Sequence, residues 1–132
     1  MDLLNQQTLR RVYQHCNKLY PKEVCGLIYS DGTVHSAEHS LDMCDHSLLK
    51  RSLKEVNPSR VVYYSHTDLG AHFSESDAQR VLENGKPKYP VSYLVVDTTS
   101  RVCRGAKLYS FSDGDYRCVA AYDPLGKLLK SA

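Results

Sequence analysis

The stretch from residue 61 to residue 85 restricts the fold most, because it holds three clear structural signals in a row. Residues 61–66 (VVYYSH) are β-branched and aromatic, which favours a strand. A loop through Gly70 follows, and a helical segment, SESDAQRVLENG, begins at Ser74. Ser74 with Asp77 three positions later is typical of a helix N-terminus, and Gly85 marks the helix end. A strand, a loop and a helix in this order predict an α/β protein.

The rest of the sequence adds elements on both sides of this segment. Apolar residues at three- and four-residue intervals between residues 9 and 20 predict an amphipathic helix that ends before Pro21. Residues 23–29, the Asp31-Gly32 turn and residues 33–37 predict two adjacent antiparallel strands. A loop over residues 38–45, a helix over 47–56 and strands over 91–97, 102–111 and 116–122 complete the prediction.

Composition excludes several classes of function. The formal net charge of +2 is too small, and the basic residues are too dispersed, to indicate binding to nucleic acid. No long apolar run or secretion signal is present, so we expect a cytoplasmic protein with no membrane partner. The five cysteines contain no Cys-x-x-Cys pair, which favours reduced thiols, with Cys25 buried. We expect a single domain over residues 1–132, with a core over about 3–122 and a tail over 123–132.

Four polar side chains of the strand–loop–helix segment can converge in space. On a strand, Tyr64 and His66 point to the same face about 6.6 Å apart, and Ser74 and Asp77 share one face of the first helical turn. Catalytic zinc sites use His nitrogen and carboxylate oxygen at about 2.0–2.2 Å and keep one position open for water. His66 and Asp77 are therefore candidate zinc ligands.

The spacing of these residues resembles the motif of the JAMM (JAB/MPN, Mov34/PAD-1) metallopeptidase family. That motif has a glutamate on an early strand, then His-x-His, seven residues, Ser, two residues and Asp. Glu23, His66, Ser74 and Asp77 occupy the corresponding positions. The segments PKEVCGL, SHTDLGAHFSESD, LVVD and GAKLYSF are also similar to small bacterial single-domain members. The resemblance implies the JAB/MPN (cytidine-deaminase-like) fold, in which helices flank a mixed β-sheet.

The resemblance also implies an activity and a role for each residue. His66 and Asp77 would bind one zinc ion per chain, Glu23 would be the general base, and Ser74 would hydrogen-bond the oxyanion. The expected enzyme is a zinc-dependent metallopeptidase or isopeptidase, similar to deubiquitinases. Its substrate would be an amide bond at the C-terminus of a ubiquitin-like or sulfur-carrier protein. Zinc can lower the pKa of bound water to about 7, which suits a carboxylate base at neutral pH.

Tyr64 stands where the motif has its first histidine, which leaves three arrangements open. A Tyr64 phenolate would give a zinc centre of lower net charge, and hence a weaker Lewis acid. His72, two residues before Ser74, would instead supply an imidazole from the loop. With neither as third ligand, His66 and Asp77 would coordinate zinc weakly. The alternative to the peptidase is then a catalytically inactive MPN-type domain that binds a partner protein.

Overall fold

The computed structural model describes residues 4–37, 49–67, 70–99 and 103–131. The described helices are α1 (Gln6–Lys18), α3 (Leu49–Ser52) and α4 (Glu75–Val81). The described strands are β1 (Cys25–Tyr29), β2 (Val34–Ala37), β3 (Ser59–His66), β4 (Leu82–Glu83), β5 (Lys86–Pro87), β6 (Ser92–Asp97), β7 (Ala106–Ser112), β8 (Asp115–Tyr122) and β9 (Leu128–Ser131).

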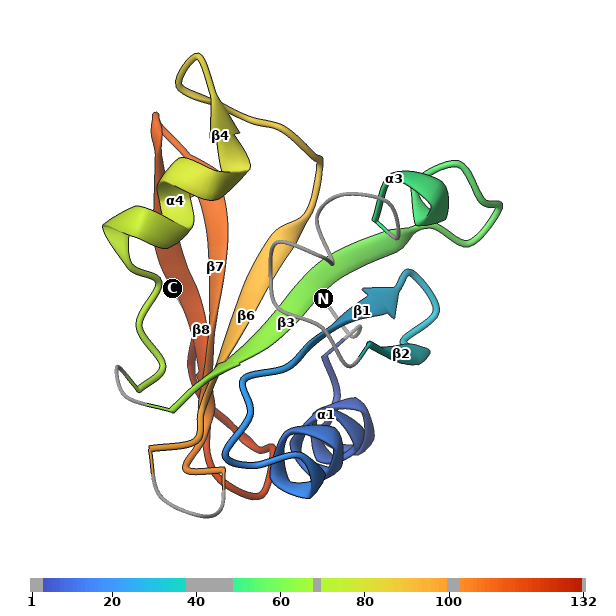
Figure 1. Cartoon of the computed structure of the whole chain (residues 1–132), viewed down its shortest axis with the longest axis vertical. Coiled ribbons are helices and arrows are strands. Elements are labelled where there is room, and N and C mark those ends of the chain that lie inside the picture. The colour runs from blue at the N-terminus through green and yellow to red at the C-terminus, as the bar shows by residue number, and fades with distance from the viewer. Residues whose placement is uncertain (1–3, 38–48, 68–69, 100–102, 132) are drawn as a thin grey trace.

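Seven of these strands form one sheet in the order β2-β1-β3-β6-β7-β8-β9, and β4 and β5 pair separately. Strands β3 and β6 are parallel, whereas the other neighbouring pairs are antiparallel (Figure 1). The sheet is therefore mixed. The chain has an α/β fold in which helices flank a mixed sheet, as the sequence predicted.

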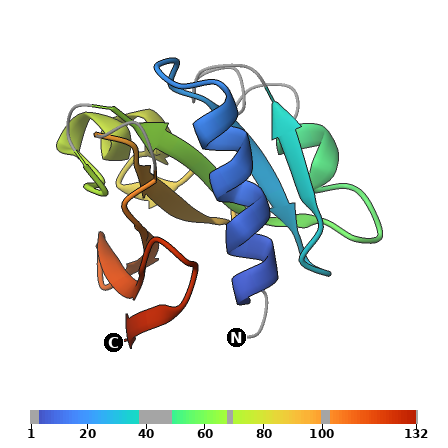
Figure 2. The ribbon, with the colours of Figure 1, turned by 90° about the horizontal axis from the view of Figure 1, so that it is seen from below.

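Helix α1 covers one face of the sheet (Figure 2). Its N-cap is Asn5, whose side chain accepts a hydrogen bond from the Thr8 backbone N–H at 2.9 Å. Its apolar side chains recur at helical spacing and are buried against inward-facing residues of β1, β3, β6, β7 and β8. Burial of this stripe is what fixes α1 on the sheet.

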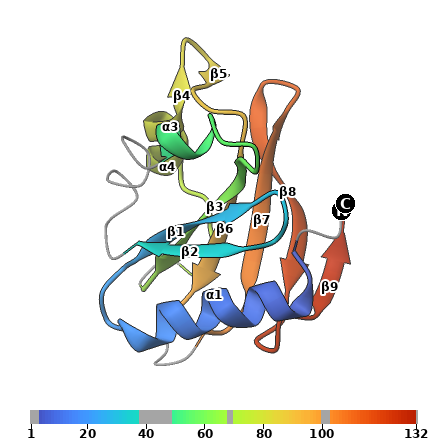
Figure 3. The same cartoon turned by 90° about the vertical axis from the view of Figure 1, so that its right-hand side faces the viewer.

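Helices α3 and α4 lie on the opposite side of the sheet from α1 (Figure 3). Between β3 and α4, Phe73 enters this second core, and its ring centroid lies 4.9–5.5 Å from those of Tyr93, Tyr109 and Tyr116. Aromatic pairs at these separations are favourable beyond their buried area. The Phe73 contacts therefore anchor the chain that leads into α4.

The parallel pair β3 and β6 determines where a site can form. Parallel neighbours need a crossover connection, and here the chain leaves β3 at His66 and passes through α4 before it enters β6. Helix α4 therefore begins beside the carboxyl end of β3. In α/β sheets this is the end at which binding sites are commonly built.

The predicted helix after Ser74 is shorter in the structure than in the sequence analysis. Helix α4 ends at Val81, and the chain turns back as the β4–β5 hairpin. Asn84 and Gly85 have φ angles of 55° and 76° at the tip, as a two-residue hairpin turn requires. Gly85 is thus a hairpin residue, and the prediction that it marks the helix end is wrong.

Two other regions also differ from the prediction. The predicted helix over residues 47–56 is reduced to α3, and the predicted loop over 38–45 lies outside the described residues. The predicted tail over 123–132 contributes β9, which pairs with β8 at the edge of the sheet. The chain after Asp123 therefore extends the sheet.

The structure also tests what the sequence predicts for the cysteines and for membrane-spanning helices. Cys16, Cys103 and Cys118 are free, whereas Cys25 is disulfide-bonded, so the prediction of a reduced thiol at Cys25 is wrong. Among the described residues, no helix is long and apolar enough to cross a membrane.

Candidate functional site

Three elements bring the motif residues around one small cavity, which we call the polar cavity. It has a volume of about 70 Å³, and it is lined by Glu23, Val24, Tyr64, Ser65, His66, Asp77 and Arg80. Glu23 precedes β1, His66 ends β3, and Asp77 lies in the first turn of α4. The backbone N–H of Ser65 donates to the Val24 carbonyl, and the Val24 N–H donates to Ser65 Oγ, both at 3.0 Å. These two bonds hold Glu23 beside the end of β3.

Asp77 is the centre of the hydrogen bonding in this cavity. Its Oδ2 accepts from Tyr64 Oη at 2.8 Å, from His66 Nε2 at 3.1 Å and from the Ser74 backbone N–H at 3.0 Å. Burial acts to raise the pKa of Asp77, but the bonds from His66, Ser74 and Tyr64 outweigh it and lower the pKa to about 2. Asp77 is therefore an ionised carboxylate at neutral pH.

Tyr64 is a hydrogen-bond donor in this arrangement. Its side chain is buried, and its ring packs edge-on against His66 with the centroids 5.2 Å apart. Burial, and next the charge of Asp77, raise the pKa of Tyr64 far above the usual value for a phenol. The phenol keeps its proton and donates it to Asp77, so Tyr64 is not a phenolate here.

His66 lies between two carboxylates. Its Nε2 faces Asp77, and its Nδ1 lies 3.7 Å from Glu23 Oε2. An ionised carboxylate only accepts hydrogen bonds, so Nε2 carries a hydrogen and donates it to Asp77. The same nitrogen cannot at once offer a lone pair to a metal ion. Thr98 holds the end of β3 by donating from both its backbone N–H and its hydroxyl to the His66 carbonyl, each at 2.9 Å.

Glu23 is partly exposed at the mouth of the polar cavity. Its Oε2 accepts from the backbone N–H of Thr67 at 3.0 Å and from the Thr67 hydroxyl at 3.3 Å. Because both donors belong to the residue after His66, these bonds attach the Glu23 side chain to the end of β3. Both bonds go to Oε2, so neither of them occupies the second carboxylate oxygen, Oε1.

The two remaining predicted site residues lie outside the lining of the polar cavity. Ser74 is the N-cap of α4, and its Oγ accepts from the Asp77 backbone N–H at 3.0 Å in a capping box with Asp77. His72 is exposed. The structure therefore brings Glu23, His66 and Asp77 together with Tyr64, keeps Ser74 next to them, and does not bring in His72.

Sequence reasoning missed Arg80 and Thr67. Arg80 lines the polar cavity from α4, where it lies three residues after Asp77 and hence on the same side of the helix. That spacing was a usable signal. Thr67 could not have been found, because its bonds to Glu23 depend on how β1 and β3 lie together.

The residues of this site do not fit a zinc ion held by three protein ligands. In the part of the chain that the structure describes, no group of three His, Cys, Asp or Glu side chains could hold a metal ion. His66 and Asp77 are two suitable ligands, and the third neighbour is the Tyr64 phenol with its proton in place. Catalytic zinc sites use three charged or imidazole ligands. Three hydrogen-bond donors, from Tyr64, His66 and Ser74, already occupy Asp77 Oδ2.

Comparisons with known proteins give the fold alone. No family model matches the chain, and no curated protein matches it. Among solved structures it is similar to protein DSY2949 from Desulfitobacterium hafniense, with a TM-score of 0.59, 17% identity and 86% of each chain covered. It is also similar to a protein from Salinibacter ruber, with a TM-score of 0.51, 14% identity, and 85% and 84% of the two chains covered. These similarities support the α/β arrangement.

Proposed function

We propose that this chain is a JAMM-type domain with the JAB/MPN fold, whose site binds a partner protein and holds no catalytic zinc. The partner class carried by the sequence resemblance is a ubiquitin-like or sulfur-carrier protein. The single observation behind the loss of zinc is the 2.8 Å hydrogen bond from Tyr64 Oη to Asp77 Oδ2. The Tyr64 hydroxyl thus lies next to Asp77 at the sequence position where the motif has its first histidine.

The fold supports the family resemblance behind this proposal. Glu23 lies next to the first strand of the sheet, His66 at the end of β3, and Asp77 at the start of the crossover helix. Residues separated by up to 54 positions in the sequence therefore line one cavity. If the match to the motif were a coincidence, there would be no reason to expect these residues in one cavity.

The zinc-dependent peptidase is the second candidate, and one distance favours it. His66 Nε2 and Asp77 Oδ2 are 3.1 Å apart, whereas two ligands on a tetrahedral zinc at about 2.0–2.1 Å lie roughly 3.3 Å from each other. The pair would thus need little movement to share an ion. Glu23 and Ser74 would then keep the roles that the motif implies.

Zinc analysis of the wild-type chain and of Tyr64→His separates the two candidates. We expect little zinc in the wild type and about one zinc per chain in Tyr64→His, because the change supplies the missing imidazole. Tyr64→Phe is the matched control, since it also removes the bond to Asp77 but adds no ligand. Stoichiometric zinc in the wild type would contradict the proposal.

The partner and the activity are tested with a ubiquitin-fold sulfur-carrier protein and a linear fusion that extends its C-terminus. We expect binding that a chelator does not change, and no cleavage of the fusion by the wild type. Cleavage that is lost on chelation and in Glu23→Gln would establish the peptidase instead. Absence of both binding and cleavage would reject this partner class.

A further inference from the structure

Cys16 and Cys103 are two free cysteines that are buried in the same apolar cluster, although they lie far apart in the sequence. Cys16 is on α1, and Cys103 is on the connection between β6 and β7. Their exposed fractions are 0% and 4%. Neither of them lines the polar cavity. The proposed function therefore leaves this pair of thiols without a role.

Two hydrogen bonds hold Cys103 against the turn of α1 that carries Cys16. The Cys103 backbone N–H donates to Asn17 Oδ1 at 2.9 Å, and its thiol donates to the Tyr13 carbonyl at 3.6 Å. Asn17 directly follows Cys16, and Tyr13 is three residues before it. A helical side chain leans back over the residues three and four positions earlier. The Cys16 side chain therefore lies on the side of α1 that presents this carbonyl to Cys103.

The two thiols also interact with each other. A hydrogen bond with Cys103, and next burial, raise the pKa of the Cys16 thiol well above its usual value. Cys16 is thus a protonated thiol at neutral pH. Buried thiols are shielded from bulky reagents, whereas the exposed Cys118 is open to them. Only a small reagent can reach the pair in the folded chain.

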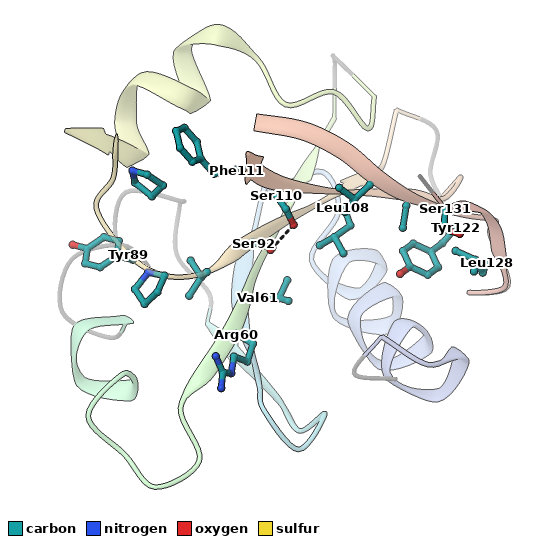
Figure 4. A pocket seen from close by; sticks show the side chains of 15 residues that line it. Arg60, Val61, Tyr89, Ser92, Leu108, Ser110, Phe111, Tyr122, Leu128 and Ser131 are labelled. Atoms are coloured by element: carbon teal, nitrogen blue, oxygen red, sulfur yellow. Dashed lines mark hydrogen bonds between the residues drawn. The ribbon is translucent and has the colours of Figure 1, made fainter. Parts of the chain in front are cut away.

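The sheet also carries a groove that is separate from the polar cavity. Its volume is about 620 Å³, and strands β3, β6, β7, β8 and β9 each contribute to its lining (Figure 4). The lining is mostly apolar, and Ser92 Oγ and Ser110 Oγ bond to each other within it at 2.7 Å. Leu128 lines the groove with 57% of its surface exposed. The groove therefore admits solvent to an apolar part of the fold.

This groove opens on the part of the core that contains the two thiols. Leu108, Ala120 and Tyr122 line it and belong to the same apolar cluster as the cysteine pair. Burial, and next the neighbouring Cys103, raise the pKa of Tyr13, and Tyr122 adds to this effect. Tyr122 thus lies both in the groove and near the residues around the pair. A small neutral molecule in the groove is already at the edge of this cluster.

We propose that Cys16 and Cys103 form an intramolecular disulfide when the protein meets a small hydroperoxide, with hydrogen peroxide as the simplest case. The peroxide oxidises one thiol to a sulfenic acid and is itself reduced to water. The second thiol then attacks that sulfur, the S–S bond forms, and the hydroxyl group leaves as a second water. Each cysteine loses its thiol hydrogen. Because the fold already holds the thiols together, the second step is effectively unimolecular.

The disulfide would join α1 to the end of the sheet that carries the polar cavity. Cys103 and Thr98 lie on the same connection after β6, and Thr98 donates two hydrogen bonds to the His66 carbonyl. A cross-link between distant parts of the chain stabilises the fold mainly by restricting the unfolded chain. Oxidation should therefore stabilise the protein. This inference does not depend on the partner or on the zinc content of the polar cavity.

Peptide mapping of the full chain after treatment with hydrogen peroxide tests the proposal. Trypsin releases Cys16 in VYQHCNK and Cys103 in VCR. After the remaining thiols are blocked with iodoacetamide, we expect these two peptides joined, with the two thiol hydrogens lost. The same treatment in urea should give far less of this linked pair. Unlinked peptides from the folded chain, or equal linkage in urea, would overturn the proposal.

Thermal unfolding of variants gives a second measurement. Oxidation should raise the Tm of the wild type by about 10 °C, as expected for a disulfide that closes a long loop. Cys118→Ser, which removes an exposed thiol outside the pair, is the matched control and should show the same rise. Cys103→Ser should show none. No rise in the wild type, or an equal rise in Cys103→Ser, would overturn the proposal, and the wild-type peptide map tests it even where a variant fails to fold.

Discussion

The polar cavity and the groove lie on the same sheet, but the side chains of each are kept in place by different interactions. The polar cavity is small, and its side chains are bound to one another through Asp77. The groove is almost nine times larger, and its lining is mostly apolar and held by the sheet itself. Changes in the polar cavity should therefore alter the stability of the fold strongly, whereas polar changes in the groove should alter it little.

Removal of Asp77 should have the largest effect. Asp77→Ala leaves Tyr64 Oη, His66 Nε2 and the Ser74 N–H without their common acceptor, and it removes half of the α4 capping box. We expect the free energy of unfolding to fall by about 3 kcal/mol or more, measured by urea denaturation. Ser76→Ala, an exposed position in the same helical turn, should change it by less than about 0.5 kcal/mol. Equal effects at the two positions would show that the network contributes little.

Acid should weaken the polar cavity next most strongly. The pKa of Asp77 is about 2 in the folded chain and near 3.8 without these contacts, so its stabilisation is complete above pH 4. It is lost as the pH falls from about 4 toward 2, and the full difference is on the order of 2 kcal/mol. Denaturation of the wild type and Asp77→Asn at both pH values isolates this contribution. The wild type should lose more stability than Asp77→Asn, and parallel losses would contradict the assignment.

Loss of the Tyr64 hydroxyl alone should have a smaller effect. Tyr64→Phe keeps the ring packed between His66 and Phe73 but removes one of three donors to Asp77. We expect a loss of about 1.5 kcal/mol in the free energy of unfolding, as for a hydrogen bond to a charged group. Tyr29→Phe, at a half-buried ring on β1, is the control and should remain within about 0.5 kcal/mol of the wild type. A neutral Tyr64→Phe would mean that the bond to Asp77 adds no stability.

A polar change in the groove should have the smallest effect on stability. Ser110→Ala removes the partner of Ser92, and both side chains are only partly buried. We expect the free energy of unfolding to change by about 0.5 kcal/mol, since water can replace the lost bond. A loss as large as that of Asp77→Ala would remove the contrast between the two regions.

The sequence predicted the polar cavity better than it predicted the groove, for physical reasons. Glu23, His66 and Asp77 were identifiable because strand and helix periodicity, together with the family motif, specify their positions. The protonation state of Tyr64 could not be predicted, because its pKa depends on burial and on the charge of Asp77, which only the fold brings close. The groove depends on which part of the sheet α1 leaves uncovered, and residues such as Ser92 and Leu128 carry no pattern of their own. Likewise, β9 forms only because β8 offers it an edge.

The β4–β5 hairpin offers a practical way to follow both regions in one molecule. Its tip at Asn84 and Gly85 is exposed, and a side-chain atom added at Gly85 would meet nothing within 4 Å. Exposed turns of this kind accept insertions and attached groups with little effect on the fold. Because the positive φ of Gly85 disfavours a side chain there, the neighbouring exposed Lys86 is the better attachment point. A fluorophore on a Lys86→Cys variant that also carries Cys118→Ser, to remove the exposed free thiol, would sit on the connection between α4, which carries Asp77, and β6, which carries Ser92. One reporter at that turn could record occupancy on either side of the sheet.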